Sequence, residues 1–171
     1  MKKVIFVLLI IALLGIGCSD KKNTAAASAE PAEEDSSIPD GIDVVIGERF
    51  FITQIYDISY NYKDYLGKSI KIEGLFKDRH WDGKIAYYVY RNTPGCCGND
   101  GEIGYELSWD PEYEGGVLDD NSDQRIYPNI NDWVEVRGTL KRYERSGFPA
   151  LYLALSELNV MDKRGKEFVA N

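Results

Sequence analysis

Two adjacent cysteines, Cys96 and Cys97, are the side chains of this sequence with the clearest capacity for chemistry. They lie in the segment Pro94-Gly-Cys-Cys-Gly-Asn-Asp-Gly, whose composition predicts a turn between two strands. Thiolates bind soft metal ions such as Cu(I) and Zn(II), and two thiols can form a disulfide. The turn is therefore the first candidate for a functional site.

Three interpretations of the cysteine turn remain open. A Cys96–Cys97 disulfide would be strained, because adjacent α-carbons lie about 3.8 Å apart and bridged ones about 4.4–6.8 Å apart, so it suits a redox switch more than a structural link. A metal site for Zn or Cu would use Cys96, Cys97, Asp100 and the single histidine, His80, although adjacent thiolates often diverge and the hairpin near His80 would have to approach the turn. In a structural role, one cysteine packs as a small apolar residue.

Other residues are weaker candidates. Arg91 precedes the turn and could bind an anionic ligand, with an ion pair to Asp100 or Glu106 as the alternative. The 3 tryptophans and 12 tyrosines are expected mainly in the core and in cross-strand pairs, with a stacking surface for sugars as the alternative. The sequence contains no Ser-His-Asp, phosphate-loop or metalloprotease motif, and we expect no enzymatic activity.

Residues 1–17 have the features of a lipoprotein signal peptide. Lys2 and Lys3 precede an apolar run, Val4 to Leu14, that is too short to span a bilayer comfortably. Small residues then lead to Cys18 and resemble a bacterial lipobox, although Gly15 stands where a branched residue is usual. We predict that Cys18 is lipidated, with an ordinary cleaved signal peptide or an uncleaved membrane anchor as alternatives.

Composition separates a tether from a domain. Residues 18–41 are rich in Ala, Ser and Glu, with no large apolar residue before Ile38, which predicts a disordered tether. Residues 42–171 are predicted to form the folded domain. The formal net charge of -8 disfavours nucleic-acid binding, which depends on phosphate contacts. We expect the protein in the cell envelope, lipid-anchored on the outer side of the cytoplasmic membrane or in the outer membrane.

Five strands follow from alternating patterns and turn signals. The first begins at Lys68 and ends before the hairpin signal Asp82-Gly83. The others are predicted over Lys84–Arg91, Ile103–Trp109, Trp133–Leu140 and Leu151–Val160, with an irregular acidic loop over 110–131. With hairpin links and glycine-interrupted strands, this pattern predicts a mainly β fold: a small five-stranded OB-like Greek-key barrel, with a β-sandwich as the alternative.

The N-terminal extension and the C-terminal tail are less regular. Phe50–Ile58 is rich in aromatic and β-branched residues and is predicted to be a strand. Helix is the competing prediction there, because Phe51, Ile55 and Ile58 are spaced by four and three. A helical turn is expected over Asn61–Leu66, ended by Gly67. Asp162–Asn171 is a charged tail with room for a short helix.

Several short motifs carry a family resemblance over Ile46 to Val169. The chain resembles a group of uncharacterised bacterial lipoproteins and, more distantly, the C-terminal domain of small membrane proteins thought to act as permease partners. The resemblance implies an OB-like barrel and no assigned function. It rests on Gly47-Glu-Arg-Phe-Phe, Tyr65-Leu-Gly-Lys, Glu73-Gly-Leu-Phe, Arg91 with Pro94-Gly-Cys-Cys-Gly-Asn-Asp-Gly, and Asp132-Trp-Val.

Together these features predict a lipid-anchored, non-enzymatic binding module. The Cys96-Cys97 turn would bind a small ligand, a metal ion or a protein partner in the envelope, such as a permease. A thiol-redox protein that uses the same two cysteines is one alternative, and a structural envelope protein is the other.

Overall fold

The computed structural model describes residues 41–110, 112–118 and 125–170. The predicted signal peptide, the predicted lipidation site Cys18 and all but the last residue of the predicted tether lie outside these ranges. Within them, no helix has both the length and the apolar character that crossing a membrane requires.

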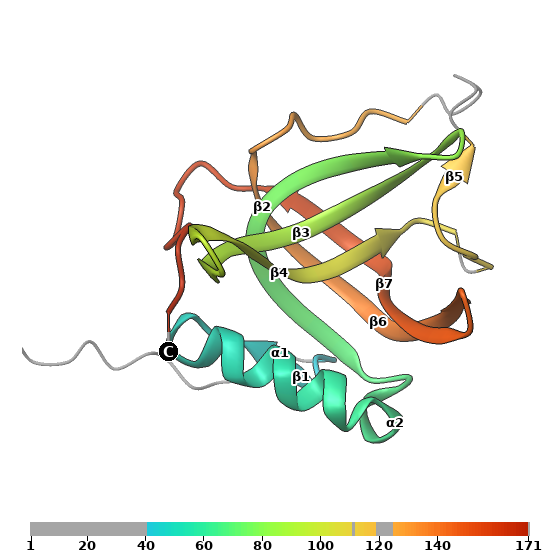
Figure 1. Cartoon of the computed structure of the whole chain (residues 1–171), viewed down its shortest axis with the longest axis horizontal. Helices are drawn as coiled ribbons and strands as arrows, with labels where there is room; N and C mark the ends of the chain where they lie inside the picture. Colours follow the sequence, from blue (N-terminus) through green and yellow to red (C-terminus); the bar gives the residue numbers. More distant parts are fainter. Residues whose placement is uncertain (1–40, 111, 119–124, 171) are drawn as a thin grey trace, which may run out of the picture. The chain divides into compact units, whose positions relative to one another are not determined.

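Five long strands close a barrel: β2 (Ser69–Trp81), β3 (Lys84–Gly95), β4 (Gly98–Ser108), β6 (Trp133–Arg145) and β7 (Phe148–Val160). The order around the barrel is β2-β3-β4-β7-β6 and back to β2 (Figure 1). Only the β4–β7 pairing is parallel among these contacts. This closed arrangement confirms the predicted OB-like barrel and excludes the β-sandwich alternative.

Closure depends on a bend in the middle of β2. Its first half pairs with β6 and its second half with β3, and Leu75 belongs to both pairings, opposite Trp133 and Tyr90. A Cβ atom on Gly74 would stand 2.5 Å from the carbonyl oxygen of Tyr90. Gly74 therefore allows β3 to approach at the bend, as expected for a glycine inside a strongly curved strand.

The N-terminal extension forms β1 (Val44–Ile46), a 3-10 turn (Glu48–Phe50) and two helices, α1 (Phe51–Tyr60) and α2 (Tyr62–Tyr65). The strand predicted over Phe50–Ile58 is wrong, and the competing helix is correct. Phe51, Ile55 and Ile58 are buried on one face of α1 and belong to the same core cluster as the barrel residues. Figure 1 shows α1 across one end of the barrel, so its apolar face completes the core there. The short α2 confirms the helical turn predicted before Gly67.

The predicted hairpin at Asp82-Gly83 is confirmed, and a second hairpin of the same kind forms at Ser146-Gly147. Asp82 and Gly83 join β2 to β3, and Ser146 and Gly147 join β6 to β7, with positive φ angles at all four residues. Two-residue loops of this kind match the twist of the flanking strands. The described part of the acidic loop contributes a short strand, β5 (Val117–Leu118), beside the start of β3.

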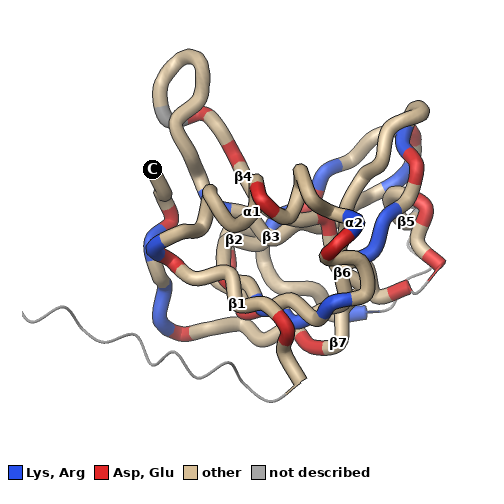
Figure 2. Tube along the Cα trace, turned by 90° about the horizontal axis from the view of Figure 1, so that it is seen from below, with Lys and Arg blue, Asp and Glu red and all other residues tan. Residues whose placement is uncertain are grey.

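The C-terminal tail runs beside β3 instead of forming a helix within residues 162–170. The amide of Asn92 donates to the Glu167 carbonyl over 2.8 Å, and the amide of Val169 donates to the Asn92 carbonyl over 2.9 Å. Val169 is buried in the core cluster. Figure 2 shows acidic and basic positions interspersed along the trace of the strands and loops.

Candidate functional site

The cysteine turn is the tip of the hairpin between β3 and β4. Gly95 pairs with Gly98 across the hairpin, so Cys96 and Cys97 are the two residues of the connection. Both cysteines are exposed. Gly98 has a φ of 128°, in the region that favours glycine. The turn that the sequence predicts is therefore present, and it places both thiols at the surface.

The two sulfur atoms point to the same side of the turn. Cys96 Sγ and Cys97 Sγ lie 3.4 Å apart, and both cysteines are free thiols. A disulfide would require about 2.05 Å. Two sulfurs on one tetrahedral zinc ion, each about 2.3 Å from it, lie about 3.8 Å apart. The separation is therefore closer to that of two ligands of one metal ion than to that of a disulfide, and these adjacent thiols do not diverge.

Asp100 is the third member of the cluster. One atom from each of Cys96, Cys97 and Asp100 lies within 4.8 Å of the others, and all three residues are exposed. The carboxylate is folded over the turn, because a Cβ atom on Gly95 would stand 2.0 Å from Asp100 Oδ1. The absence of a side chain at position 95 thus lets the carboxylate approach the two sulfurs.

These three donors fit a soft or borderline metal ion. Thiolate sulfur is the preferred ligand of Cu(I) and a common ligand of Zn(II), which also accepts carboxylate oxygen. With three protein ligands, a tetrahedral ion keeps one position for water or for a further ligand. The exposed tip leaves that position open to a partner molecule.

His80 does not belong to this cluster. It lies in β2 opposite Ile85 at the start of β3, whereas the cysteines follow the end of β3, so the two sites occupy opposite ends of that strand (Figure 1). Its Nε2 atom lies 3.2 Å from Asp78 Oδ2. The approach of the β2–β3 hairpin to the cysteine turn, which a four-ligand site with His80 would need, does not occur.

Arg91 is near the turn in sequence but buried inside the domain. Its guanidinium lies between aromatic rings, with Cζ 4.4 Å from the ring centre of Phe51 and 4.9 Å from that of Trp133. Nε donates to the carbonyl oxygen of Glu73 over 3.0 Å, and burial lowers the pKa of the side chain, against the charges of Glu48 and Glu73. Arg91 is only 2% exposed, so in this conformation it is a core residue and not a surface site for an anion.

The two acids considered as partners of Arg91 lie elsewhere. Asp100 is at the cysteine turn, and Glu106 accepts hydrogen bonds from Arg145. The acids whose charges act on Arg91 are Glu48 and Glu73. Alternation along the strand could not reveal this, because the burial of Arg91 depends on α1 and on Trp133 of β6.

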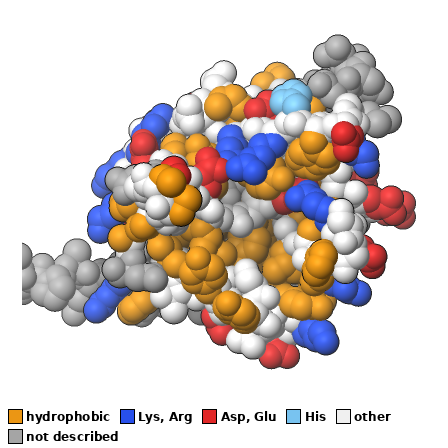
Figure 3. Space-filling model, in the orientation of Figure 1, with side chains coloured by type: hydrophobic (Ala, Val, Ile, Leu, Met, Phe, Trp, Pro, Cys, Tyr) orange, Lys and Arg blue, Asp and Glu red, His pale blue; other side chains and the backbone are white. Residues whose placement is uncertain are grey.

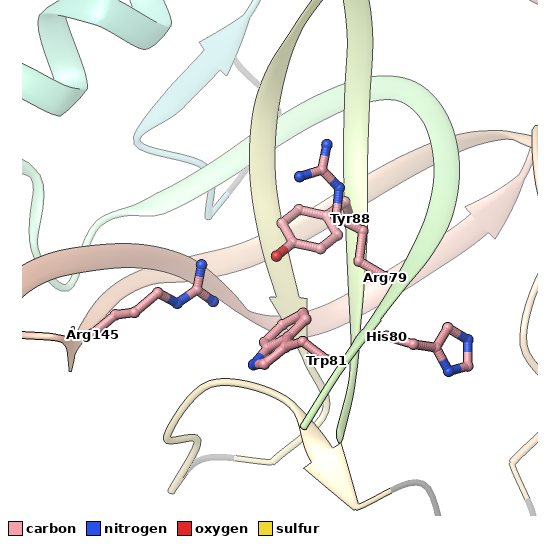
Figure 4. Close-up of a pocket in the computed structure, with 5 residues that line it drawn as sticks. All are labelled: Arg79, His80, Trp81, Tyr88 and Arg145. Atoms are coloured by element: carbon pink, nitrogen blue, oxygen red, sulfur yellow. The ribbon is translucent and has the colours of Figure 1, made fainter. Parts of the chain in front are cut away.

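A second group of side chains was not predicted from the sequence as a site, although His80 was a candidate on its own. Arg79, His80 and Trp81 of β2, Tyr88 of β3 and Arg145 of β6 line a pocket of about 450 Å³, which we call the hairpin pocket (Figure 4). The alternation of β2 could have placed Arg79 and Trp81 on one face. Arg145 joins them only through barrel closure, and nothing in the sequence pattern indicates that contact.

Comparisons of this chain with models of protein families, with curated proteins and with solved structures found no match.

Proposed function

We propose that this protein is an exported, lipid-anchored, non-enzymatic binding module whose cysteine turn holds a soft metal ion. Residues 1–17 serve as the signal peptide, Cys18 carries the lipid, and residues 18–41 tether the domain to the membrane. Cys96, Cys97 and Asp100 are the metal ligands, and Zn(II) and Cu(I) are the ions that suit them. The 3.4 Å separation of the two sulfurs supports this proposal most directly.

The position of the turn suits binding to a further molecule. The hairpin tip is exposed, and a three-ligand ion would have an open coordination position. A small ligand or an envelope protein, such as a permease, could complete the coordination. The buried arginine and the helix α1 support the barrel behind the turn and do not take part in binding.

Metal titration tests this function. The full chain, purified without a metal-affinity tag, is titrated with Zn(II) and with Cu(I) in competition with a coloured chelator. One ion per chain is expected, and the variant Cys96→Ser/Cys97→Ser is expected to bind none at this position. Ser59→Ala is the matched control, because Ser59 Oγ bonds within helix α1 to the Ile55 carbonyl. Unchanged binding by the double variant would reject the proposal.

The same sulfur pair favours one second function, a thiol-redox role. Sulfurs 3.4 Å apart need a limited movement to form a bond, and the resulting disulfide between adjacent residues would be strained and easily reduced. Thiol titration before and after oxidation separates the two functions. If Cys96 and Cys97 form a reversible disulfide and the reduced protein binds neither ion, the redox function replaces the metal function.

A further inference from the structure

The hairpin pocket combines two stacked arginines with two aromatic faces. Arg145 Cζ lies 5.1 Å from the ring centre of Trp81, and Arg79 Cζ lies 5.6 Å from that of Tyr88. An arginine stacked on a ring keeps the N–H groups at the edge of its plane available for a carboxylate. Figure 4 shows Arg145 reaching from β6 toward Trp81 and Tyr88, whereas the ring of His80 points away from the other four side chains.

The buried carboxylate of Glu106 holds Arg145 in place. The Nη2 atom of Arg145 donates to both carboxylate oxygens of Glu106, over 2.8 and 3.0 Å, and Glu106 is only 4% exposed. These two bonds use Nη2 alone, and a guanidinium has five N–H donors. The remaining donors on Nε and Nη1 can therefore serve the Tyr88 hydroxyl, which hydrogen-bonds Arg145, and a ligand in the pocket.

Arg79 brings positive charge that its partner does not fully compensate. Arg79 Nη2 donates to Glu102 Oε2 over 2.6 Å, and Lys77 Nζ donates to the same oxygen. One carboxylate thus serves two cations, which leaves a surplus of one positive charge in this group. The Arg79 side chain is 58% exposed and can meet a ligand without a rearrangement of the core.

The rim of the pocket also offers a carboxylate acceptor. Glu102 lies beside Arg79 and accepts a hydrogen bond from its Nη2 atom. The space-filling view in Figure 3 shows basic side chains next to hydrophobic ones, with the histidine, in pale blue, close by. A ligand that fits this lining has an anionic group for the arginines, a hydroxyl for Glu102 and a ring that can contact the aromatic side chains.

From this lining we infer that the hairpin pocket binds a sugar ring that carries a carboxylate, as in the uronic acids. The carboxylate contacts the guanidinium edges of Arg79 and Arg145, the ring contacts the side chains of Trp81 and Tyr88 beside these arginines, and a hydroxyl donates to Glu102 at the rim. A singly charged carboxylate is favoured over a doubly charged phosphate, because the protein carries a net charge of -8. The pocket volume of about 450 Å³ lies within the range of about 300–1,000 Å³ that is usual for small-ligand sites.

Titration of the full chain, labelled with ¹⁵N, tests this inference. The indole N–H signal of Trp81, assigned with Trp81→Phe, is followed during addition of D-galacturonate and its trimer. A saturable shift is expected, with a dissociation constant raised about tenfold in Arg79→Gln, because a charge-assisted hydrogen bond is lost. Lys77 still holds Glu102 in this variant, so the fold is expected to persist. Arg142→Gln, an exposed arginine of β6 outside the pocket, should bind like the unchanged protein.

Neutral D-galactose and inorganic phosphate are the comparison ligands, and both are expected to bind at least about tenfold more weakly than galacturonate. Four results would overturn the inference. These are no shift of the Trp81 signal with either acidic sugar, an equal response to galactose, equal or tighter binding of phosphate, and unchanged galacturonate affinity in Arg79→Gln. None of these results depends on metal binding at the cysteine turn.

Discussion

The carboxylate of Asp100 occupies the space that a side chain at Gly95 would need: a Cβ atom there would stand 2.0 Å from Asp100 Oδ1. This relationship explains why a glycine precedes the two cysteines. A methyl group at position 95 would displace the acid, and it would also stand 2.8 Å from the backbone nitrogen of Gly101, so it would shift the hairpin that carries the thiols.

Gly95→Ala should therefore weaken metal binding, both by displacing Asp100 and by shifting the hairpin backbone at Gly101. We expect its affinity for Zn(II) to fall at least as far as that of Asp100→Asn. The Asp100→Asn affinity is itself expected to be at least about tenfold below that of the unchanged protein, because residues that only orient metal ligands already contribute about 10–100-fold. Competition with a chelator measures the affinity, and thiol titration confirms that both sulfurs remain. Gly47→Ala is the control, because a Cβ at Gly47 meets nothing within 4 Å. Undiminished affinity in Gly95→Ala, with weak binding in Asp100→Asn, would contradict this role of Gly95.

Glu106 is expected to be a major contributor to stability. Its buried carboxylate accepts hydrogen bonds from Arg145, from Tyr143 over 3.0 Å and from Tyr113. Glu106→Ala leaves these donors without their partner, so the free energy of unfolding should fall by about 3 kcal/mol in urea denaturation. Glu144→Ala, at an exposed position of β6, should change it by less than about 0.5 kcal/mol. Equal effects of the two substitutions would show that the buried network contributes little.

The barrel could be predicted from the sequence because its strands and hairpins carry local signals. Alternating side chains, Asp82-Gly83 and Ser146-Gly147 each specify structure over a few residues. The helix α1 was assigned wrongly because its β-branched and aromatic residues favour a strand, whereas the end of the barrel requires one continuous apolar face. The spacing of Phe51, Ile55 and Ile58 was the better signal, since it reflects that face.

The candidate sites also differ in how far they depend on local sequence. Cys96, Cys97 and Asp100 come from one hairpin and lie together, so their grouping could be foreseen from a local turn. His80, Arg91 and the hairpin pocket depend on which strands meet after closure. Trp133 beside Arg91, and Arg145 beside Trp81, are contacts between residues more than 40 positions apart, and no local pattern encodes them.

Acid should weaken the fold through Glu102. Burial opposes its ionisation, but the hydrogen bonds and charges of Lys77 and Arg79 outweigh this effect and hold the pKa of Glu102 below its usual value. A carboxylate with a lowered pKa in the folded state stabilises the protein above its unfolded pKa, about 4.3. This stabilisation is lost as the pH falls through the lower, folded value.

Glu102→Gln makes this pH dependence measurable. The difference in urea midpoint between the unchanged protein and Glu102→Gln should be largest at pH 7, smaller near pH 4 and absent in stronger acid. Glu157→Gln is the control: this side chain is 46% exposed, its carboxylate lies 3.5 Å from Arg137, and the substitution should change the urea midpoint little. A difference for Glu102→Gln that stays constant across this pH range would mean that the Lys77–Glu102–Arg79 group does not act through ionisation.

X-ray absorption at the zinc edge of the Zn(II)-loaded full chain tests the metal site most directly. Coordination by the cysteine turn predicts two sulfur neighbours at about 2.3 Å, with the remaining positions filled by oxygen at about 2.0–2.2 Å. The sulfur signal should be absent from Cys96→Ser/Cys97→Ser. A spectrum of the unchanged protein with only oxygen and nitrogen neighbours would contradict the proposed role of the paired sulfurs.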